Sequence, residues 1–331
     1  MTMTSVGDIE RFDTAVASAD TDGAIDVVED LLRLGVDPVT VMVDVIAPVQ
    51  ARVGRRWQDG TWSVAQEHAA TTVAVSALEA VSRATRPAGG ARGRVVIACA
   101  EREWHAVPAM IVAGALRAEG WQITLLGAST PTARLSRYLQ DLGPDVTAVS
   151  CSVAAGLPNA RGFIEASTTA GIPVLAGGAA FGPDDRRARA LGATAWAHDA
   201  RGATEAIAGL PTVVEAVPAL PAEVTREVAA LRTAHRDLVL DAATQAAAAG
   251  ADDPDRSLRD ALDQAMHAVT GAVLTSDERL LTETSGWTSD VLRARGHRDA
   301  DAIVHSALAH ALRDYPLAAG LVRRHWPGAT S

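Results

Sequence analysis

The sequence predicts a multidomain protein of mixed α and α/β class. We expect an N-terminal four-helix bundle, a central Rossmann-like (flavodoxin-like) parallel sheet and a C-terminal all-α domain. Apolar residues recur at three- and four-residue steps over residues 1–86, as amphipathic helices require. Short apolar runs then alternate with helical stretches over residues 91–210, which is typical of a parallel sheet with right-handed crossovers. A Pro-punctuated linker over 211–221 precedes helical periodicity in 222–331.

Chain length, charge and cysteine content limit the classes of protein to which the chain can belong. A chain of 331 residues is long enough for two or three domains with their own cores. Its formal net charge of -10 argues against a nucleic-acid-binding surface. The N-terminus lacks the pattern of a signal peptide, and no apolar run reaches the roughly 18 residues of a membrane span. Cys99 and Cys151 lie in apolar, strand-like runs. We therefore expect a cytoplasmic protein without nucleic-acid or membrane partners, with both thiols in the core.

The N-terminal region has the lengths and short connections of an antiparallel bundle. Asp37 and Pro38 indicate one helix start, and the capping-box pattern beginning at Ser63 indicates another. Trp57 ends the third expected helix, and Glu67 and His68 lie in the first turn of the fourth. Taken singly, these three residues fit structural roles as a core anchor and helix-dipole partners. The expected helices are Asp8–Ser18, Gly23–Leu34, Pro38–Trp57 and Ser63–Arg83.

The central region places polar and glycine-rich segments after successive strands. Residues 101–108 follow the first strand, 127–131 the second, 150–153 the third and 177–182 the fourth. Open parallel sheets bind ligands at this carboxyl edge. A nicotinamide fold is disfavoured, because no GxGxxG follows the first strand. The expected strands are Arg94–Ala100, Gln122–Leu126, Asp145–Ser150, Pro173–Ala176 and a weak Thr194–Ala197.

These segments together resemble the cobalamin-binding domain of the methionine synthase and methylmalonyl-CoA mutase type. The resemblance implies that His105 is the lower axial ligand of cobalt and that Glu103 occupies the acidic position of the motif. Pro108 departs from the family, which usually has Gly there. The resemblance also implies cofactor contacts from the loops at the strand ends, namely Trp104, Ala106, Val107, Ser129, Thr130, Ser150, Ser152, Val153, Gly177, Gly178 and Ala179.

Trp57, nine intervening residues and then Glu67-His68 resemble the light-sensing adenosylcobalamin proteins, such as the light-dependent repressors of carotenoid synthesis. This implies that Trp57 caps the 5′-deoxyadenosyl group and that Glu67 and His68 line its pocket. It further implies a signalling photoreceptor, not an enzyme, in which photolysis of the Co–C bond changes the conformation or the assembly of a homo-oligomer. Gln58 departs from those repressors, which have at this position a His that takes the upper cobalt position after photolysis.

The order of the three domains resembles the photocobilins, which combine cobalamin with biliverdin. That resemblance implies a second, noncovalent chromophore, because no Cys follows Cys151. A haem held by His267 or His305 is the rival hypothesis, and ordinary structural roles for all the candidate residues stay open. The expected helices are Glu223–Ala249, Asp255–Leu274, Asp277–Thr284, Trp287–Arg295 and Asp299–Asp314. The candidate bilin contacts are His267, Trp287, Arg293, Arg295 and His305.

Two further functions remain as alternatives. A corrinoid methyl carrier of a methyltransferase system shares the bundle and cobalamin-domain layout, but a methyl group needs no adenosyl pocket. A cobalamin-responsive regulator that ignores light would differ in having a partner interaction that is unchanged by illumination.

Overall fold

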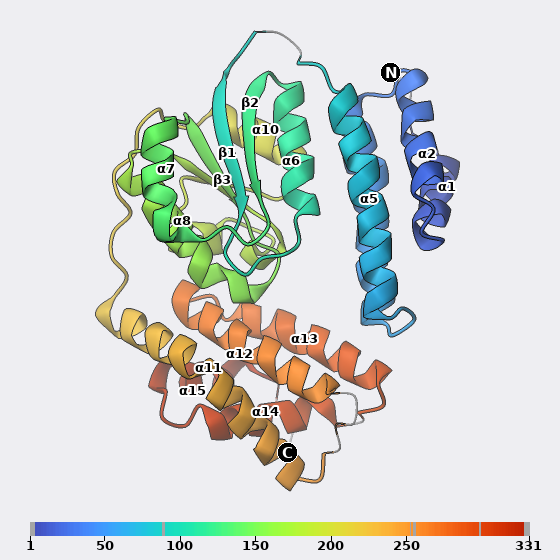
Figure 1. Cartoon of the computed structure of the whole chain (residues 1–331). Coiled ribbons are helices and arrows are strands. Elements are labelled where there is room, and N and C mark those ends of the chain that lie inside the picture. Colours follow the sequence, from blue (N-terminus) through green and yellow to red (C-terminus); the bar gives the residue numbers. More distant parts are fainter. Residues whose placement is uncertain (1–3, 88–89, 252, 254–255, 298, 328–331) are drawn as a thin grey trace.

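A computed structural model describes residues 4–327 apart from 88–89, 252, 254–255 and 298. Three bodies follow one another along the chain, and Figure 1 shows the helical bundle beside the sheet domain, with the C-terminal helices below both. The predicted fold class is confirmed. Within the described residues, no helix combines the length and the apolar character that crossing a bilayer requires.

The N-terminal bundle buries the apolar faces predicted from periodicity. Phe12, Val28, Val45 and Leu78 are at most 1% exposed in its core. Ser63 and Gln66 form the expected capping box. A π-helical stretch, Val41–Ile46, interrupts the third long helical run. The helices are α1 (Val6–Ala17), α2 (Thr21–Arg33), α3 (Pro38–Thr40), α4 (Ala47–Gln58) and α5 (Val64–Ala84).

The central domain is a five-stranded parallel sheet in the order β2-β1-β3-β4-β5. The strands are β1 (Gly93–Cys99), β2 (Trp121–Gly127), β3 (Val146–Ser150), β4 (Val174–Gly177) and β5 (Ala195–Ala197). Alternate side chains of β1 enter different cores: Ile97 packs with α6 (Val107–Ala118) and α10 (Ala200–Ala208), whereas Val96 faces the opposite side. The strand order reverses between β1 and β3, where sheets of this kind form their ligand crevice.

The opposite face of the sheet is covered by α7 (Leu135–Leu142), α8 (Leu157–Thr169) and α9 (Arg186–Ala190). Short 3-10 turns precede several helices, at Thr132–Arg134, Ala154–Gly156 and Ala179–Phe181. The linker 211–221 has no regular secondary structure, as expected. It is held against the domain by Arg161, whose guanidinium donates to the Pro218 carbonyl at 2.5 Å.

The C-terminal helices are α11 (Ala222–Ala248), α12 (Ser257–Thr275), α13 (Arg279–Ala294), α14 (Ala300–Ala311) and α15 (Pro316–His325). The prediction of separate helices over 277–284 and 287–295 was wrong, because one helix, α13, runs through both. Its buried Ser285 donates to the Thr282 carbonyl at 3.0 Å and leaves the helix intact. The expected start at Asp255 lies outside the described residues. Helix α15 was not expected, although Pro316 occupies the first turn where proline is tolerated.

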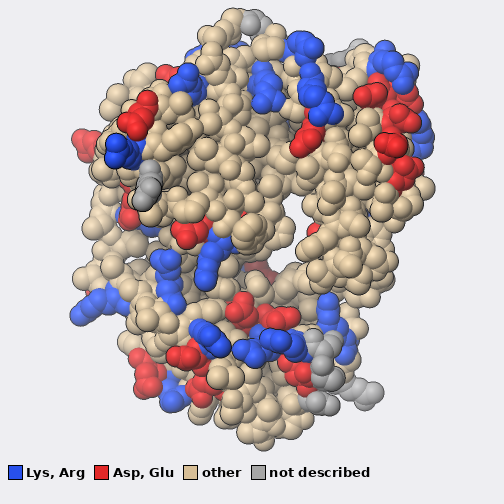
Figure 2. All heavy atoms as spheres, in the orientation of Figure 1, with Lys and Arg blue, Asp and Glu red and all other residues tan. Residues whose placement is uncertain are grey.

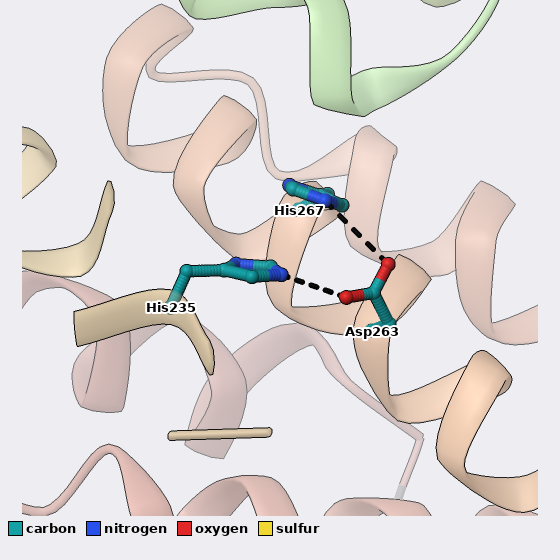
Figure 3. A group of neighbouring side chains, drawn as sticks. All are labelled: His235, Asp263 and His267. Carbon is teal, nitrogen blue, oxygen red and sulfur yellow. Dashed lines mark hydrogen bonds and ion pairs between the residues drawn. The ribbon is translucent and has the colours of Figure 1, made fainter. Parts of the chain in front are cut away.

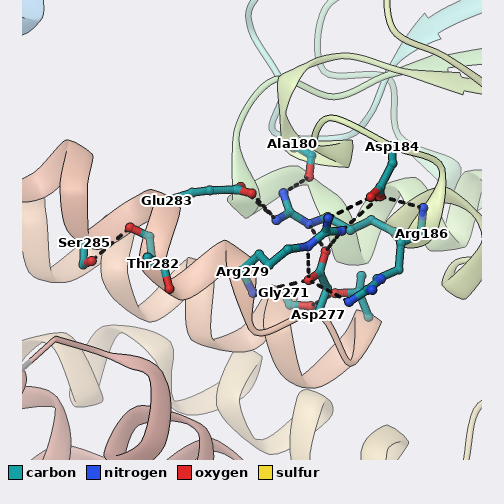
Figure 4. A network of polar contacts seen from close by, with 11 residues as sticks. Ala180, Asp184, Arg186, Gly271, Asp277, Arg279, Thr282, Glu283 and Ser285 are labelled. Atoms are coloured by element: carbon teal, nitrogen blue, oxygen red, sulfur yellow. Dashed lines mark hydrogen bonds and ion pairs between the residues drawn. The ribbon is translucent and has the colours of Figure 1, made fainter.

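The C-terminal domain is fixed to the sheet domain by a buried ionic network (Figure 4). The Arg187 and Asp277 side chains are 0% exposed, and Arg187 Nε lies 2.9 Å from the Asp277 carboxylate. Arg187 also contacts Glu283 at 2.8 Å and donates to the Ala180 carbonyl at 3.2 Å. Arg279 bridges Asp277 to Asp184 at 2.7 Å from each. The turn before α13 and the first turns of α13 therefore hold the segment that follows β4.

Candidate cofactor-binding site

A cleft of about 910 Å³ lies between the bundle and the carboxyl edge of the sheet. Figure 2 shows the molecule hollowed between these two bodies. One wall is a single face of the helical run 38–58 together with the facing residues of α5, and the other is the loop after β1 with the ends of β3 and β4. The cleft continues between the sheet and helices α6 and α10, where its lining includes the apolar residues Ile97, Ala148, Leu175, Ala197 and Ala203.

His105 projects into the cleft from the loop after β1, and Glu103 orients it. The His105 side chain is 60% exposed, whereas that of Glu103 is 0% exposed. One Glu103 oxygen lies 2.6 Å from His105 Nδ1 and accepts the His105 backbone N–H at 2.8 Å. The other accepts the backbone N–H groups of Ser152 and Val153. A carboxylate at Nδ1 favours the proton there and leaves the Nε2 lone pair available to a metal.

Burial and hydrogen bonding shift the pKa values of Glu103 and His105 in opposite directions. Burial alone would raise the pKa of Glu103, but hydrogen bonds from the His105 ring and backbone and from the Ser152 N–H give a net lowering. The Glu103 hydrogen bond raises the pKa of His105 against the effect of burial, and the charge of Glu67 on α5 adds to the rise. The Glu67 carboxylate is thus close enough across the cleft to influence His105.

Hydrogen bonds to the loop after β2 hold the loop that carries His105. The Ser129 N–H donates to the Glu103 carbonyl at 2.8 Å, and the Ser129 hydroxyl accepts from the Arg102 N–H at 3.1 Å. The Thr130 N–H donates to the Cys99 carbonyl at 3.2 Å. Five of the expected cofactor residues lie outside the lining of the cleft and support the loops instead: Glu103, Ser129, Thr130, Val153 and Ala179. The other expected residues of the bundle and the sheet domain line it.

Gly178 shows why glycine follows β4. Its φ is +103°, and a Cβ at this position would lie 2.4 Å from the backbone oxygen of Cys151. The glycine lets the loops after β3 and β4 approach each other at the floor of the cleft. Cys99 and Cys151, which we expect in the core from the sequence, are both buried and have free thiols.

Hydrogen-bonded polar side chains line the bundle wall of the cleft, and the sequence predicted only Glu67 and His68 among them. Gln50 Nε2 donates to the Thr71 hydroxyl at 2.8 Å, and Thr71 donates to the Glu67 carboxylate at 2.9 Å. Glu67 also contacts His68 Nδ1. Gln50 lines the cleft, and its Oε1 is buried without a hydrogen-bond partner among the described residues. Gln50 lies two helical turns before Trp57 on the same face, and that spacing was the available signal.

Trp57 lines the cleft and also contacts the C-terminal domain. Its ring lies 6.0 Å from that of Trp287 on α13, at an interplanar angle of 28°. The Arg295 guanidinium lies 5.7 Å from the Trp57 ring centroid. Gln58 is half-buried at the end of α4.

The candidate bilin residues contact different partners. Trp287 and Arg295 face Trp57, whereas Arg293 pairs with Asp301 at 2.9 Å and His267 lies against His235 and Asp263. His305 is half-buried on α14. The structure therefore brings Trp287 and Arg295 together near the cleft and places Arg293 and His267 in separate contacts.

Comparison with known proteins agrees with this geometry. Residues 93–208 match a family model described as a B12 binding domain, and residues 8–82 match a second model with the same description. Both ranges are thus similar to B12 binding domains. They account for both walls of the cleft, since the first range supplies the loop that carries His105 and the second supplies α4 and α5.

Two curated relatives come from Myxococcus xanthus. The HTH-type transcriptional repressor CarH is 32% identical over 158 residues, which cover 47% of this chain and 52% of CarH. The HTH-type transcriptional repressor CarA is 30% identical over 141 residues, covering 43% of this chain and 46% of CarA. The chain thus spans about half the length of the curated relatives it matches. Both relatives are described as HTH-type transcriptional repressors, and this conflicts with our expectation that the chain has no nucleic-acid partner. We therefore do not retain that expectation.

A solved structure shares the fold of the two B12-binding domains. The monomethylamine corrinoid protein of Methanosarcina barkeri superposes with a TM-score of 0.53 at 16% identity, covering 60% of this chain and 96% of that protein. The residues present here also fit a cobalamin. The cleft offers an exposed imidazole held at Nδ1, an unpartnered amide oxygen on the facing wall and a deep apolar extension beside the sheet.

Proposed function

We propose that the chain is a light-sensing photoreceptor, without enzymatic activity, that binds adenosylcobalamin. In this proposal His105 is the lower axial ligand of cobalt and Trp57 lies over the adenosyl group. The observation that carries it is the cleft itself, with an oriented imidazole on one wall and an aromatic ring beside hydrogen-bonding groups on the other. When bound, the cofactor supplies a Co–C bond that light breaks.

The chain's own residues have defined tasks in this proposal. Glu103 keeps the proton on His105 Nδ1 and so directs the Nε2 lone pair to the metal. Gln50 Oε1 and the Glu67 carboxylate accept hydrogen bonds from ribose hydroxyls or the adenine amino group. Trp57 offers a flat apolar face for the adenine.

Trp57 also gives a route for the signal. Because its ring stacks on Trp287 and lies beside Arg295, a change in what occupies the upper cleft alters the packing between α4 and α13. We propose that this contact couples the cofactor to the C-terminal domain and changes the conformation or the assembly of a homo-oligomer. Two states that differ in such contacts are what a ligand-driven switch requires.

Noncovalent biliverdin as a second chromophore in the C-terminal domain is the finer part of the proposal. Arg295 and Trp287, at the junction with the bundle, are the candidates that would pair with a propionate and pack on a pyrrole ring. Addition of biliverdin to the full chain should produce a new red absorption band that is lost in Trp287→Ala. A flat red region, with a haem spectrum after haem addition, would instead favour a haem at His267 or His305.

The main test is an absorption spectrum of the full chain loaded with adenosylcobalamin, recorded in the dark and after green light. We expect conversion from alkyl to non-alkyl cobalamin, with a dark spectrum that shows imidazole ligation. His105→Ala should lose that ligation. His198→Ala, which changes another histidine of the cleft, should keep it. Size-exclusion chromatography of the same samples tests whether light changes the assembly.

The methyl-carrier alternative makes a different prediction. Trp57→Ala should weaken binding of adenosylcobalamin much more than binding of methylcobalamin if Trp57 caps the adenosyl group. If the chain binds methylcobalamin tightly and rejects the adenosyl form, the result would favour a methyl carrier of a methyltransferase system over the photoreceptor. A spectrum and an assembly that both ignore light would favour a light-independent cobalamin-responsive regulator.

A further inference from the structure

Two histidines and an aspartate form a compact cluster away from the cofactor cleft. His235 lies on α11, whereas Asp263 and His267 lie one helical turn apart on α12 (Figure 3). The potential ligand atoms of the three side chains all lie within 4.8 Å of one another. The side chains of His235 and His267 are 17% and 16% exposed, and that of Asp263 is 41% exposed. The cluster is therefore partly buried but open to solvent at the carboxylate.

Both imidazoles point the same nitrogen at the carboxylate. His235 Nε2 lies 2.8 Å from Asp263 Oδ1, and His267 Nε2 lies 3.6 Å from Asp263 Oδ2. The two rings stack with centroids 4.0 Å apart and an interplanar angle of 17°. A distance of 3.6 Å is too long for a hydrogen bond, so the carboxylate bonds well to only one of the two rings. The His267 nitrogen is thus directed at an oxygen that it does not reach.

We propose that His235, Asp263 and His267 bind a divalent transition-metal ion, for which Zn²⁺ is the best match. Two imidazole nitrogens and one carboxylate oxygen are a donor set that zinc and other first-row divalent ions accept. Two ligands at positions i and i+4 project from the same face of a helix, and the third comes from a neighbouring helix. Three protein ligands leave a fourth position for water or another small ligand.

The electrostatics of the cluster suit a cation. Burial, and then the neighbouring His235, lower the pKa of His267 to about 4, so its imidazole is neutral near pH 7. Burial alone would raise the pKa of Asp263, but the His235 hydrogen bond and the neighbouring positive charges together lower it, so the carboxylate is ionised. Arg102 is near enough to act on both groups and opposes a cation, whereas Asp260, on the preceding turn of α12, offsets it. An ionised Asp263 carboxylate and a neutral His267 imidazole suit metal binding, which requires deprotonated ligands.

The site lies beside the segment that carries His105. Arg232, one turn before His235 on α11, donates to Asn159 Oδ1 at 2.9 Å. Asn159 in turn donates to the Glu101 carbonyl at 2.7 Å, at the start of the loop after β1. A metal that joins α11 to α12 therefore stabilises the helices against which this loop is held. This inference does not depend on the identity or the light response of the cofactor.

The test is a calorimetric titration of Zn²⁺ into the cofactor-free full chain after treatment with a chelator. We expect one equivalent to bind to the wild type and the affinity to fall at least about tenfold in Asp263→Ala and His267→Ala. His310→Ala is the matched control and should leave binding unchanged. It removes another helical His–carboxylate pair, 3.7 Å from Asp241, which lacks a second stacked imidazole.

A second measurement guards against loss of folding in the variants. Zn²⁺ should raise the melting temperature of the wild type and of His310→Ala but not that of His267→Gln, whose amide fills similar space. Co²⁺ in place of Zn²⁺ should give the visible bands of a nitrogen- and oxygen-ligated ion in the wild type and in His310→Ala but not in the cluster variants. Failure of the wild type to bind Zn²⁺, or equal affinities in the wild type and the cluster variants, would overturn the proposal.

Discussion

Replacing Glu103 by Gln tests how the loop that carries His105 is held. The buried carboxylate accepts four N–H groups, two from His105 and one each from Ser152 and Val153. A glutamine amide has one oxygen, which can serve only one of these pairs, and its NH₂ group then faces the two donors of the other pair. Each buried donor left without an acceptor costs about 1–3 kcal/mol, so Glu103→Gln should cost about 2–6 kcal/mol. That is a large share of the free energy of unfolding of a typical domain, which is roughly 5–15 kcal/mol.

The assay is urea denaturation of the cofactor-free full chain, followed by circular dichroism. Glu101→Gln, two residues earlier in the same loop, is the control, and it should stay within about 0.5 kcal/mol of wild type. Glu103→Gln should also weaken cobalamin binding about 10–100-fold, because His105 Nδ1 loses its charged partner and keeps at most a neutral amide oxygen. Equal denaturation midpoints for the two variants would refute the hydrogen-bond argument.

Two further predictions concern the C-terminal domain. Asp277→Asn removes the buried carboxylate that pairs with Arg187 and leaves only the half-exposed Glu283 as its charge partner, so it should destabilise the protein by up to about 3–5 kcal/mol in thermal or chemical unfolding. Asp290→Asn, which changes a side chain 61% exposed on the helix that follows Asp277, should cost under about 1 kcal/mol, and comparable losses in both would count against the buried network. The pKa of His267 falls from 6.5 to about 4 on folding, so the unfolded chain binds the extra proton between these values. Stability should therefore fall by up to about 3 kcal/mol as the pH drops from about 6.5 to about 4, and His267→Gln should remove that part of the pH dependence. Parallel stability–pH curves for His267→Gln and wild type would contradict it.

Local signals predicted the secondary structure well where they were strong. The capping box at Ser63 starts α5, and the apolar runs predicted the five strands within one residue at every end. The errors lie where tertiary packing overrides local preference. Ser285 and Gly286 read as a break but lie inside α13, which continues because its buried face packs on α12. Helix α15 has a short apolar face that gains stability only from the helices around it.

Part of the site was also within reach of the sequence. The order of strands and loops placed Glu103 and His105 at the carboxyl edge of the sheet, and the structure puts them beside the loop after β3. Gln50 and Thr71 were missed, because their role depends on two helices facing each other. The contact between Trp57 and Trp287 joins residues more than two hundred positions apart, and no local pattern encodes such a pairing.

The sequence by itself determined the three-domain order, the parallel sheet and the residue types at its carboxyl edge, because periodicity, turn chemistry and strand–helix alternation are local properties of the chain. Only the tertiary structure decided that Gln50 lines the cleft and bonds to Thr71, that α13 stacks on the bundle and that His235 joins Asp263 and His267. These features arise from side chains far apart in sequence. Their contacts exist only after burial of the apolar faces has fixed how the helices and the sheet pack against one another.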